Sequence, residues 1–123
     1  MEFDMPRILV VDDAKTMRDL LKDLLIPAGF EVVEAENGEH GLEMVGAHAI
    51  DLIISDLNMP GMDGVTMCSH LKQQGNTAPI FMLTTQTSPE LKVKAKEYGV
   101  VAWIVKPHND DVLLRGIKKV LGM

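Results

Sequence analysis

The sequence has a single cysteine and no long apolar run. Only Cys68 among the 123 residues carries a thiol, so no disulfide can form within the chain, and we expect a reducing, cytoplasmic environment. No apolar stretch approaches the ~20 residues that a membrane-spanning helix requires, and no signal-peptide pattern stands at the start. We therefore expect neither a disulfide-rich secreted scaffold nor a membrane-spanning protein.

Positive charge is also scarce. Lys and Arg number 12 against 18 Asp and Glu, which leaves a net charge of −6. Because affinity for nucleic acids depends mainly on cationic contacts to phosphate, we expect no direct nucleic-acid binding. No repeat, low-complexity tract or linker divides the chain. We predict a single domain over residues 6–121, preceded by a short lead-in over residues 1–5, and we expect it to be a monomer.

What the sequence does contain is organised around residues 51–64. An apolar run from Leu52 to Ile54 stops just before Asp56, a pattern typical of a short strand buried on both faces. A Pro-Gly turn follows, and Asp63 can cap the next helix. The strand therefore delivers an acid to its carboxyl end, where open α/β sheets place their binding sites.

Strand and helix patterns alternate along the rest of the chain. Apolar, β-branched runs predict strands at residues 7–11, 30–35, 79–83 and 100–105, besides the run before Asp56. Apolar residues at helical spacing predict five inward helix faces: Met17, Leu20, Leu21, Leu24 and Leu25; Leu42, Val45, Gly46 and Ala49; Val65, Cys68 and Leu71; Leu91, Ala95 and Tyr98; Leu113, Gly116, Ile117, Val120 and Leu121. The expected helix caps are Asn37, Asp63, Ser88, and Asn109 or Asp110.

Five strand–helix units predict an α/β fold. We expect a doubly wound, five-stranded parallel sheet with five helices, joined by right-handed crossovers. The flavodoxin-like strand order 2-1-3-4-5 is the expected arrangement. Its switch point lies between the first and third strands, so Asp12 and Asp13, which follow the first strand, should lie beside Asp56.

The predicted strands deliver five polar side chains to one edge of the sheet: Asp12, Asp13, Asp56, Thr84 and Lys106. Three carboxylates close together repel one another, and a hard divalent cation such as Mg²⁺ removes that conflict. The cation, the hydroxyl and the lysine would form a cradle for a phosphoryl group, and Asp56 would be the nucleophile that accepts it.

Each of these residues also has a plain structural interpretation. An acidic pair such as Asp12 and Asp13 favours the positive end of a helix. Thr84 could be an ordinary strand-end residue, and Lys106 an ordinary surface lysine. Asp56 is harder to explain in this way, because an acid that ends an apolar strand is costly without a partner. Since four of the five predicted strands end in such residues, the functional interpretation needs fewer coincidences.

Four segments carry a family resemblance: ILVVDD at residues 8–13, DLNMPGMDG at 56–64, LTT at 83–85 and AWIVKP at 102–107. Together they resemble the receiver domains of bacterial two-component response regulators. The resemblance covers about residues 6–121. Among receivers, the chain is most similar to the stand-alone chemotaxis type, CheY, which has no output domain.

The resemblance implies a regulatory phosphoacceptor, which promotes its own phosphorylation and dephosphorylation, and not an enzyme with a separate substrate. Asp56 would accept a phosphoryl group from a phosphohistidine on a sensor histidine kinase. Asp13, Asp56 and the backbone carbonyl of Asn58 would bind Mg²⁺, with Asp12 acting through water. Lys106 would contact the phosphoryl group.

The resemblance also implies a switch. Thr84 would move toward the phosphoryl group, and an aromatic at the place of Trp103 would swing inward. The face made by the fourth helix, the fifth strand and the fifth helix would change shape and control a protein partner such as the flagellar motor switch. The peptide between Lys106 and Pro107 would be cis.

Several positions would modulate this switch. Asn58 and Gln86 occupy the two places that influence the lifetime of the aspartyl phosphate in the family. Trp103 replaces the usual Tyr or Phe, and its larger indole makes the inward movement an open question. Thr85 is bulkier than the usual Ala, Gly or Ser, so we expect it to narrow access to the phosphoryl group, and His108 replaces a frequent Phe.

Other functions stay open beside a chemotaxis switch. A phosphorelay intermediate and a kinase-feedback receiver use the same domain. A Mg²⁺-dependent phosphohydrolase would need a second acid or a general base near the nucleophile, together with a substrate pocket. A flavin-binding module of the same fold would need a phosphate loop rich in Ser, Thr and Gly after the first strand, where this chain has Asp12 and Asp13.

Overall fold

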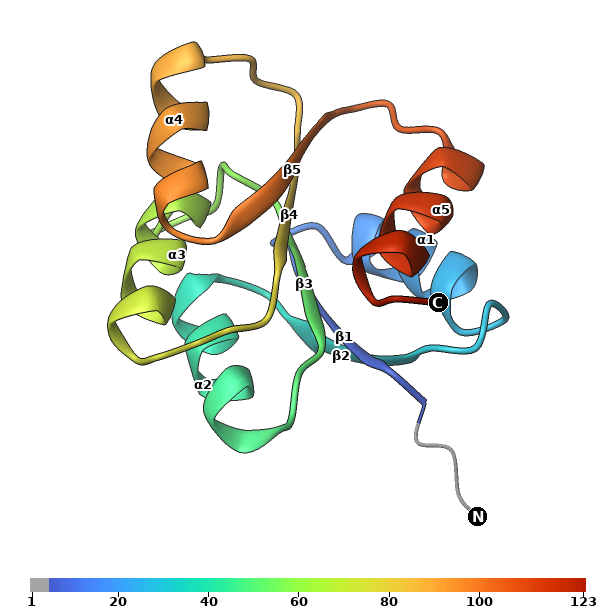
Figure 1. Cartoon of the computed structure of the whole chain (residues 1–123). Helices are drawn as coiled ribbons and strands as arrows, with labels where there is room; N and C mark the ends of the chain where they lie inside the picture. Colours follow the sequence, from blue (N-terminus) through green and yellow to red (C-terminus); the bar gives the residue numbers. More distant parts are fainter. Residues whose placement is uncertain (1–4) are drawn as a thin grey trace.

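Five strands and five helices alternate along the chain (Figure 1). The structure, a computed structural model, describes residues 5–123, so the predicted lead-in lies outside the described residues except for Met5. The strands are β1 (Arg7–Val11), β2 (Glu31–Ala35), β3 (Leu52–Ser55), β4 (Ile80–Thr84) and β5 (Val100–Val105). The helices are α1 (Lys15–Leu25), α2 (Gly38–Ala47), α3 (Gly64–Gln73), α4 (Pro89–Glu97) and α5 (Asp110–Val120).

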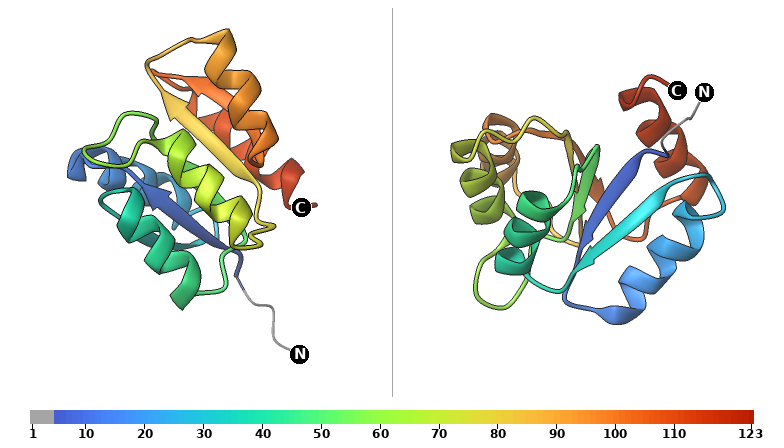
Figure 2. Two further views of the ribbon diagram at one scale, coloured as in Figure 1. Left: turned by 90° about the vertical axis from the view of Figure 1, so that its left-hand side faces the viewer. Right: turned by 90° about the horizontal axis from the view of Figure 1, so that it is seen from below.

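The strands form one parallel sheet in the order β2-β1-β3-β4-β5, which confirms the predicted flavodoxin-like fold. Because all strands run the same way, each connection returns through a helix, and helices cover both faces of the sheet (Figure 2). In neighbouring strands β1 and β3, Val11 pairs with Ser55. The residues that follow them, Asp12 and Asp56, therefore leave the sheet at the same level.

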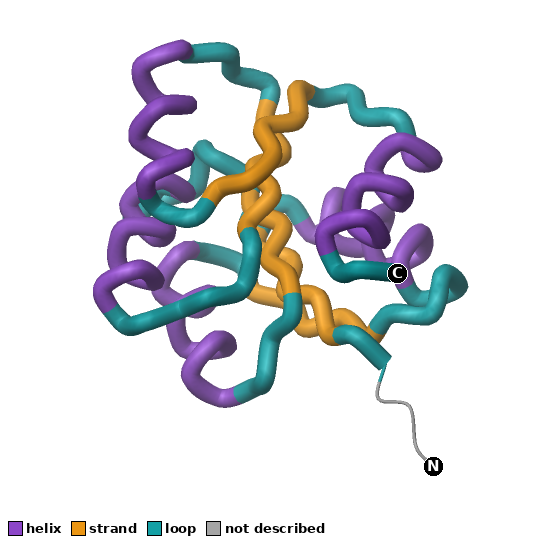
Figure 3. The backbone as a smooth tube through the Cα atoms, viewed as in Figure 1, coloured by secondary structure: helices purple, strands orange, loops and turns teal. Residues whose placement is uncertain are grey.

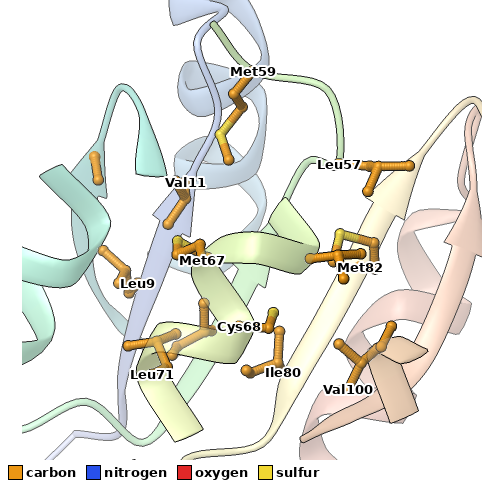
Figure 4. Packing of buried hydrophobic residues seen from close by; sticks show 14 residues of the cluster. Leu9, Val11, Leu57, Met59, Met67, Cys68, Leu71, Ile80, Met82 and Val100 are labelled. Atoms are coloured by element: carbon orange, nitrogen blue, oxygen red, sulfur yellow. The ribbon is translucent and has the colours of Figure 1, made fainter. Parts of the chain in front are cut away.

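Alternate strand residues face two separate cores. On the face covered by α2, α3 and α4, Leu9 and Val11 of β1 pack in one buried cluster with Cys68 of α3 (Figure 4). On the opposite face, Ile8 and Val10 belong to a second cluster that α1 and α5 cover. Figure 3 shows the sheet between these two helical layers. The strands are continuous apolar runs because both of their faces are buried.

Local side chains determine where most helices begin. The N-cap residues of α2, α3, α4 and α5 are Asn37, Asp63, Ser88 and Asn109, and each accepts a hydrogen bond from the backbone N–H three residues later. Asn109, and not Asp110, therefore caps the last helix. Helix α1 differs, because Ala14 at its N-cap has no side-chain acceptor and donates its own N–H to Asp12 Oδ1 (2.9 Å). The start of α1 is thus tied to an acid of the predicted site.

Four residues predicted to face inward are exposed: Leu20, Gly46, Ala49 and Val120. Leu20 is 60% exposed because it lies at the margin of the apolar face of α1, whose centre is occupied by other leucines. Helix α2 ends at Ala47, so Gly46 stands in its last turn and Ala49 lies beyond it. Val120 is the last residue of α5 and is 42% exposed. The predicted faces are therefore correct at their centres and wrong at their margins.

Strands β1 and β5 have the predicted bounds, and β2 and β4 differ from the prediction by one residue. Strand β2 begins at Glu31, and β4 spans Ile80–Thr84, which makes Thr84 the last residue of its strand. The peptide between Lys106 and Pro107 is cis, as the family resemblance implies. Among the helices of residues 5–123, none has the length and apolar character that crossing a membrane requires.

Candidate functional site

The carboxyl ends of β1 and β3 bring three carboxylates together. Asp12 and Asp13 follow β1, and Asp56 follows β3, where its backbone N–H donates to the Val11 carbonyl (3.0 Å). Each of the three acids offers a carboxylate oxygen, and these oxygens all lie within 4.8 Å of one another. The arrangement depends on the strand order, because only neighbouring strands can place their end residues side by side. The predicted proximity of the three acids is therefore present in the structure.

The three acids differ in exposure and in hydrogen bonding. Asp12 is 4% exposed, and its Oδ1 accepts the N–H of Ala14. The Asp56 side chain is 13% exposed, and its Oδ1 accepts the N–H of Leu57 (2.8 Å). Asp13 is exposed. The site is therefore a shallow one, with two acids in its wall and Asp13 at its rim.

Lys106 supplies the positive charge of this site. Its Nζ lies 3.5 Å from Asp12 Oδ2 and 3.8 Å from Asp56 Oδ1, and the side chain is 17% exposed. The backbone N–H of Lys106 donates to the Thr84 carbonyl (2.8 Å), which fixes the end of β5 against the end of β4. One ammonium group thus stands between two carboxylates that come from different strands.

The negative charge of Asp56 is not fully compensated by Lys106 and the backbone N–H groups around it. Burial raises the pKa of the Asp56 carboxyl, and the neighbouring charge of Asp12 raises it further. Lys106 and the backbone N–H groups of Leu57 and Asn58 lower the pKa, but the net shift is upward. The ionised form of Asp56 is therefore disfavoured in the folded protein, and an additional positive charge would relieve it.

The donor set fits a hard divalent cation. Carboxylate oxygens are the ligands that Mg²⁺ prefers, and three of them converge here. Among the described residues 5–123, Lys106 is the one basic side chain that forms an ion pair with Asp12 or Asp56. Three carboxylates and one ammonium leave the group with excess negative charge, and the exposed Asp13 leaves it open to an ion from solvent.

Thr84 is linked to Trp103 by two hydrogen bonds that the sequence analysis did not predict. Thr84 is fully buried, and its Oγ1 accepts the backbone N–H of Gln86 (3.2 Å). The carbonyl of the same Gln86 accepts the indole Nε1–H of Trp103 (3.0 Å). Trp103 is half-buried and packs against the core under α4. A Phe at this position could not donate the second bond, so the tryptophan alters how β5 contacts the loop after β4.

An open groove of about 570 Å³ lies between α4 and β5. Its lining includes Lys92 and Lys96 of α4 and Val101 and Trp103 of β5. The two lysines are exposed, and Val101 is 57% exposed. The groove therefore combines positive charge with apolar surface, next to the tryptophan that the loop after β4 holds.

Sequence reasoning missed Gly64, the first residue of α3. A Cβ at this position would collide with the backbone carbonyl of Asp56, and the Cα of Leu57 would lie 3.1 Å from it. The backbone N–H of Gly64 also donates to the Leu57 carbonyl (2.8 Å). A glycine directly after the Asp63 cap was the available signal, because such a position often marks a close backbone approach.

Other predicted residues lie at the edge of this arrangement. Asn58, Thr85 and Pro107 are exposed, in the loops that follow β3, β4 and β5. His108 is half-buried and its Nε2 lies 2.9 Å from Asp110 Oδ1, at the start of α5. The loops therefore surround the acids, while the side chains that touch one another are those of Asp12, Asp56 and Lys106.

Comparison with known proteins agrees with this geometry. Residues 8–118 match the family described as the response regulator receiver domain. The chemotaxis protein CheY of Bacillus subtilis is 42% identical over 116 residues, which cover 94% of this chain and 97% of that protein. CheY of Pseudomonas aeruginosa is 33% identical over 117 residues, which cover 93% of this chain and 94% of that protein.

A solved structure, that of the chemotaxis protein CheY4 of Vibrio cholerae, has a TM-score of 0.89 and 39% sequence identity, and the match covers 95% of this chain and 99% of that chain. The strand order, the acids at the switch point and the sequence matches all lead to one assignment. The chain belongs to the response regulator receiver domains of two-component systems.

Proposed function

We propose that the protein is a phosphorylation-activated signalling switch whose phosphoacceptor is Asp56 and whose donor is a phosphohistidine on a sensor histidine kinase. The observation that carries this proposal is the convergence of three carboxylates within 4.8 Å, with Lys106 between two of them. Three carboxylates this close repel one another, and a divalent cation would relieve that repulsion and offset the negative charge of an incoming phosphoryl group.

The transfer would use side chains at the carboxyl edge of the sheet. A carboxylate oxygen of Asp56 forms the bond to phosphorus while the bond from phosphorus to the kinase imidazole nitrogen breaks. The other ring nitrogen of the phosphohistidine carries a proton taken from water, so the electron pair of the broken bond stays on a neutral imidazole. Asp12, Asp13, Asp56 and the backbone carbonyl of Asn58 would hold Mg²⁺, which supplies positive charge at the phosphoryl oxygens. Lys106 donates to a phosphoryl oxygen, and Thr84 donates its hydroxyl to another.

The switch operates through the contacts of Thr84. Its hydroxyl oxygen now accepts the N–H of Gln86, whose carbonyl holds the indole of Trp103. When Thr84 turns toward a phosphoryl group on Asp56, the loop after β4 shifts, and the carbonyl that holds Trp103 shifts with it. The tryptophan and the groove beside it then adopt a second arrangement, so phosphorylation biases two states of one surface. Gln86 and Thr85 in this loop, with Asn58 after β3, modulate the lifetime of the phosphoryl group.

The surface formed by α4, β5 and α5 is the output. Its groove offers Lys92 and Lys96 beside the exposed Val101, so it suits a protein segment with apolar anchors and acidic flanks. Two relatives named as chemotaxis proteins support a role in chemotaxis. For such a role we propose a flagellar motor switch as the partner. A cytoplasmic monomer is the form in which we expect this switch to operate.

The covalent step is tested with acetyl phosphate and Mg²⁺, followed by intact-mass spectrometry and peptide mapping. The wild-type chain should gain one phosphate, and Asp56→Asn should gain none, because the amide is a poor nucleophile. Phosphate found on a serine, threonine or histidine would contradict the mechanism. Turnover of a generic phosphate ester well beyond one equivalent would instead favour the phosphohydrolase.

The switch is tested by the fluorescence of Trp103, the only tryptophan in the sequence. Phosphorylation should change its emission or its quenching, and Thr84→Ala should remove most of that change while Asp56 is still phosphorylated. Thr87→Ala is the matched control, because Thr87 lies in the same loop but is exposed where Thr84 is fully buried. If Thr84→Ala leaves the optical change intact, the hydroxyl is not the link between the two sites.

A further inference from the structure

Arg18 connects three elements next to the acidic site. It belongs to α1, its Nη1 donates to the backbone carbonyl of Asp12 (2.7 Å), and its Nε donates to Glu34 Oε1 of β2 (3.1 Å). The Arg18 side chain is only 13% exposed. Charge-assisted hydrogen bonds that are shielded from water are stronger and better defined in geometry than those on an open surface. Arg18 is therefore an ordered link between α1, the loop after β1 and the neighbouring strand.

Glu34 is itself held in position. Lys22 Nζ lies 2.9 Å from Glu34 Oε2, so two cations one turn apart on α1 engage the two oxygens of one carboxylate. Lys22, and to a lesser extent Arg18, lower the pKa of the Glu34 carboxyl, which keeps it ionised. The anchor of Arg18 on β2 therefore does not depend on Arg18 alone.

The Asp12 carbonyl, to which Arg18 donates, restrains the orientation of the Asp13 backbone. A peptide unit is planar and trans, so the direction of the Asp12 carbonyl also sets the plane from which the Asp13 Cα departs. The N–H of Asp12 is bound to the Ala35 carbonyl (3.1 Å), and its Oδ1 is bound to the N–H of Ala14. The bond from Arg18 adds the third restraint on this turn.

We propose that Arg18 is a positioning residue for the metal site: it holds the loop after β1 so that Asp13 is presented beside Asp56. The inference rests on the proposed Mg²⁺ site and extends it to a residue that touches neither the ion nor the phosphoryl group. Asp13 needs this support more than Asp12 does, because it is the exposed member of the three acids.

Charge and geometry predict opposite effects of removing Arg18. If only its charge mattered, Arg18→Met would strengthen Mg²⁺ binding, because a cation near three carboxylates repels a second cation. If Arg18 positions Asp13, the same change weakens binding. Loss of an outer-shell partner typically lowers metal affinity about 10–100-fold, and we expect about tenfold here, because Arg18 acts through the backbone. The sign of the change therefore separates the two explanations.

The chain offers a matched control at the other end of the same two strands. Arg7 of β1 lies 2.9 Å from Glu31 of β2, so Arg7→Met also removes an arginine–glutamate pair anchored on β2, but at the end of the sheet opposite Asp12, Asp13 and Asp56. Arg18→Lys is the conservative variant. One lysine ammonium cannot reproduce the two contacts that the guanidinium makes with Asp12 and Glu34. The Mg²⁺ affinity of Arg18→Lys should therefore lie between those of Arg18→Met and the wild type.

The experiment is calorimetric titration of Mg²⁺ into the full chain, with folding checked by far-ultraviolet circular dichroism and the midpoint of thermal unfolding measured in chelator. About tenfold weaker binding in Arg18→Met, with Arg7→Met unchanged, supports the inference. Unchanged or tighter binding in Arg18→Met overturns it, and so does equal weakening in both variants, which would reflect a general loss of stability. If Arg18→Met does not fold, weaker binding by folded Arg18→Lys supports the inference and unchanged binding overturns it. A wild-type chain that binds no Mg²⁺ would overturn the metal site itself, a failure distinct from an intact site that ignores Arg18.

Discussion

The two ends of the parallel sheet use the same kinds of side chain, but they differ in how far the acids are exposed to solvent. At the amino end, Arg7 lies 2.9 Å from Glu31, and its backbone N–H donates to Asp51 Oδ2 (2.7 Å). The guanidinium also reaches the carbonyl of Ala49 (3.5 Å). These contacts tie β1 to β2 and to the segment that enters β3, and the group is partly exposed. Arg7 carries one positive charge against the two carboxylates of Glu31 and Asp51, but both acids are exposed, so water solvates the charge that Arg7 does not pair.

At the carboxyl end, negative charge exceeds positive charge and is more deeply buried. Asp12, Asp13 and Asp56 converge within 4.8 Å, and Lys106 pairs with two of them at 3.5 and 3.8 Å. Burial raises the pKa of Asp56, which shows that its ionised form is not fully compensated. The two ends therefore differ in role: the solvent-exposed group at the amino end holds strands together, while the buried excess of negative charge at the carboxyl end favours binding of a cation.

The largest effect is expected from crowding the carboxyl end. Gly64→Ala would place a Cβ against the Asp56 carbonyl, which belongs to the backbone and cannot yield cheaply. We expect the free energy of unfolding to fall by about 3 kcal/mol, as in other overpacked sites. Gly46→Ala, in the last turn of α2 before the chain enters β3, meets nothing within 4 Å and should gain about 0.5–1 kcal/mol. Urea unfolding in chelator measures both, and similar values for the two variants would contradict the close approach at Gly64.

The second largest effect is expected on Mg²⁺ binding. Asp13→Asn removes one of the three charges, so we expect Mg²⁺ affinity to fall about tenfold or more, which is at least about 1.4 kcal/mol of binding free energy. Without Mg²⁺ the same variant should be more stable than the wild type, because repulsion is relieved. Calorimetric titration measures the affinity, and Asp51→Asn at the amino end is the control that should bind Mg²⁺ normally. Equal affinities for Asp13→Asn and the wild type would remove Asp13 from the site.

The pH dependence of stability tests the imbalance at Asp56 directly. Because the pKa of Asp56 is raised in the folded chain, its contribution to stability is fully present below its ordinary value of 3.8 and is lost as pH rises through the raised pKa. Asp56→Asn does not titrate, so in chelator its advantage over the wild type should grow between about pH 4 and pH 7. Saturating Mg²⁺ should shrink this advantage at neutral pH. If the difference in the free energy of unfolding between Asp56→Asn and the wild type stayed constant across this range, the negative charge of Asp56 would already be compensated in the folded chain.

The smallest effect is expected at the amino end. Arg7→Met removes a partly exposed pair with Glu31 and leaves the backbone bond to Asp51 in place. Pairs of this kind contribute about 0–1 kcal/mol, so the free energy of unfolding should fall by no more than that. Mg²⁺ affinity and phosphorylation by acetyl phosphate should not change. A loss of several kcal/mol would mean that the amino end supports more of the fold than its contacts suggest.

Much of the fold could be predicted because its signals are local or periodic. The apolar run before Asp56 predicts a doubly covered strand, and Asn37, Asp63 and Ser88 cap the helices that follow them. Alternation of strands with helices leaves few topologies once crossovers must be right-handed. The predicted helix faces failed at positions such as Leu20, because periodicity gives the direction of a face but not its width, which depends on what packs against it.

The sequence by itself determined which residues reach the carboxyl edge of the sheet, because each of them directly follows or ends a strand. Only the tertiary structure decided how they are compensated. The pairing of Lys106 with both Asp12 and Asp56, and the bond between Gln86 and Trp103, join segments far apart in the chain. The contact of Arg18 with the Asp12 carbonyl joins residues only six apart, but the same guanidinium is also bound to Glu34 of β2. No local pattern carries such contacts, because their distances are set by the order and register of strands and by the packing of helices upon them.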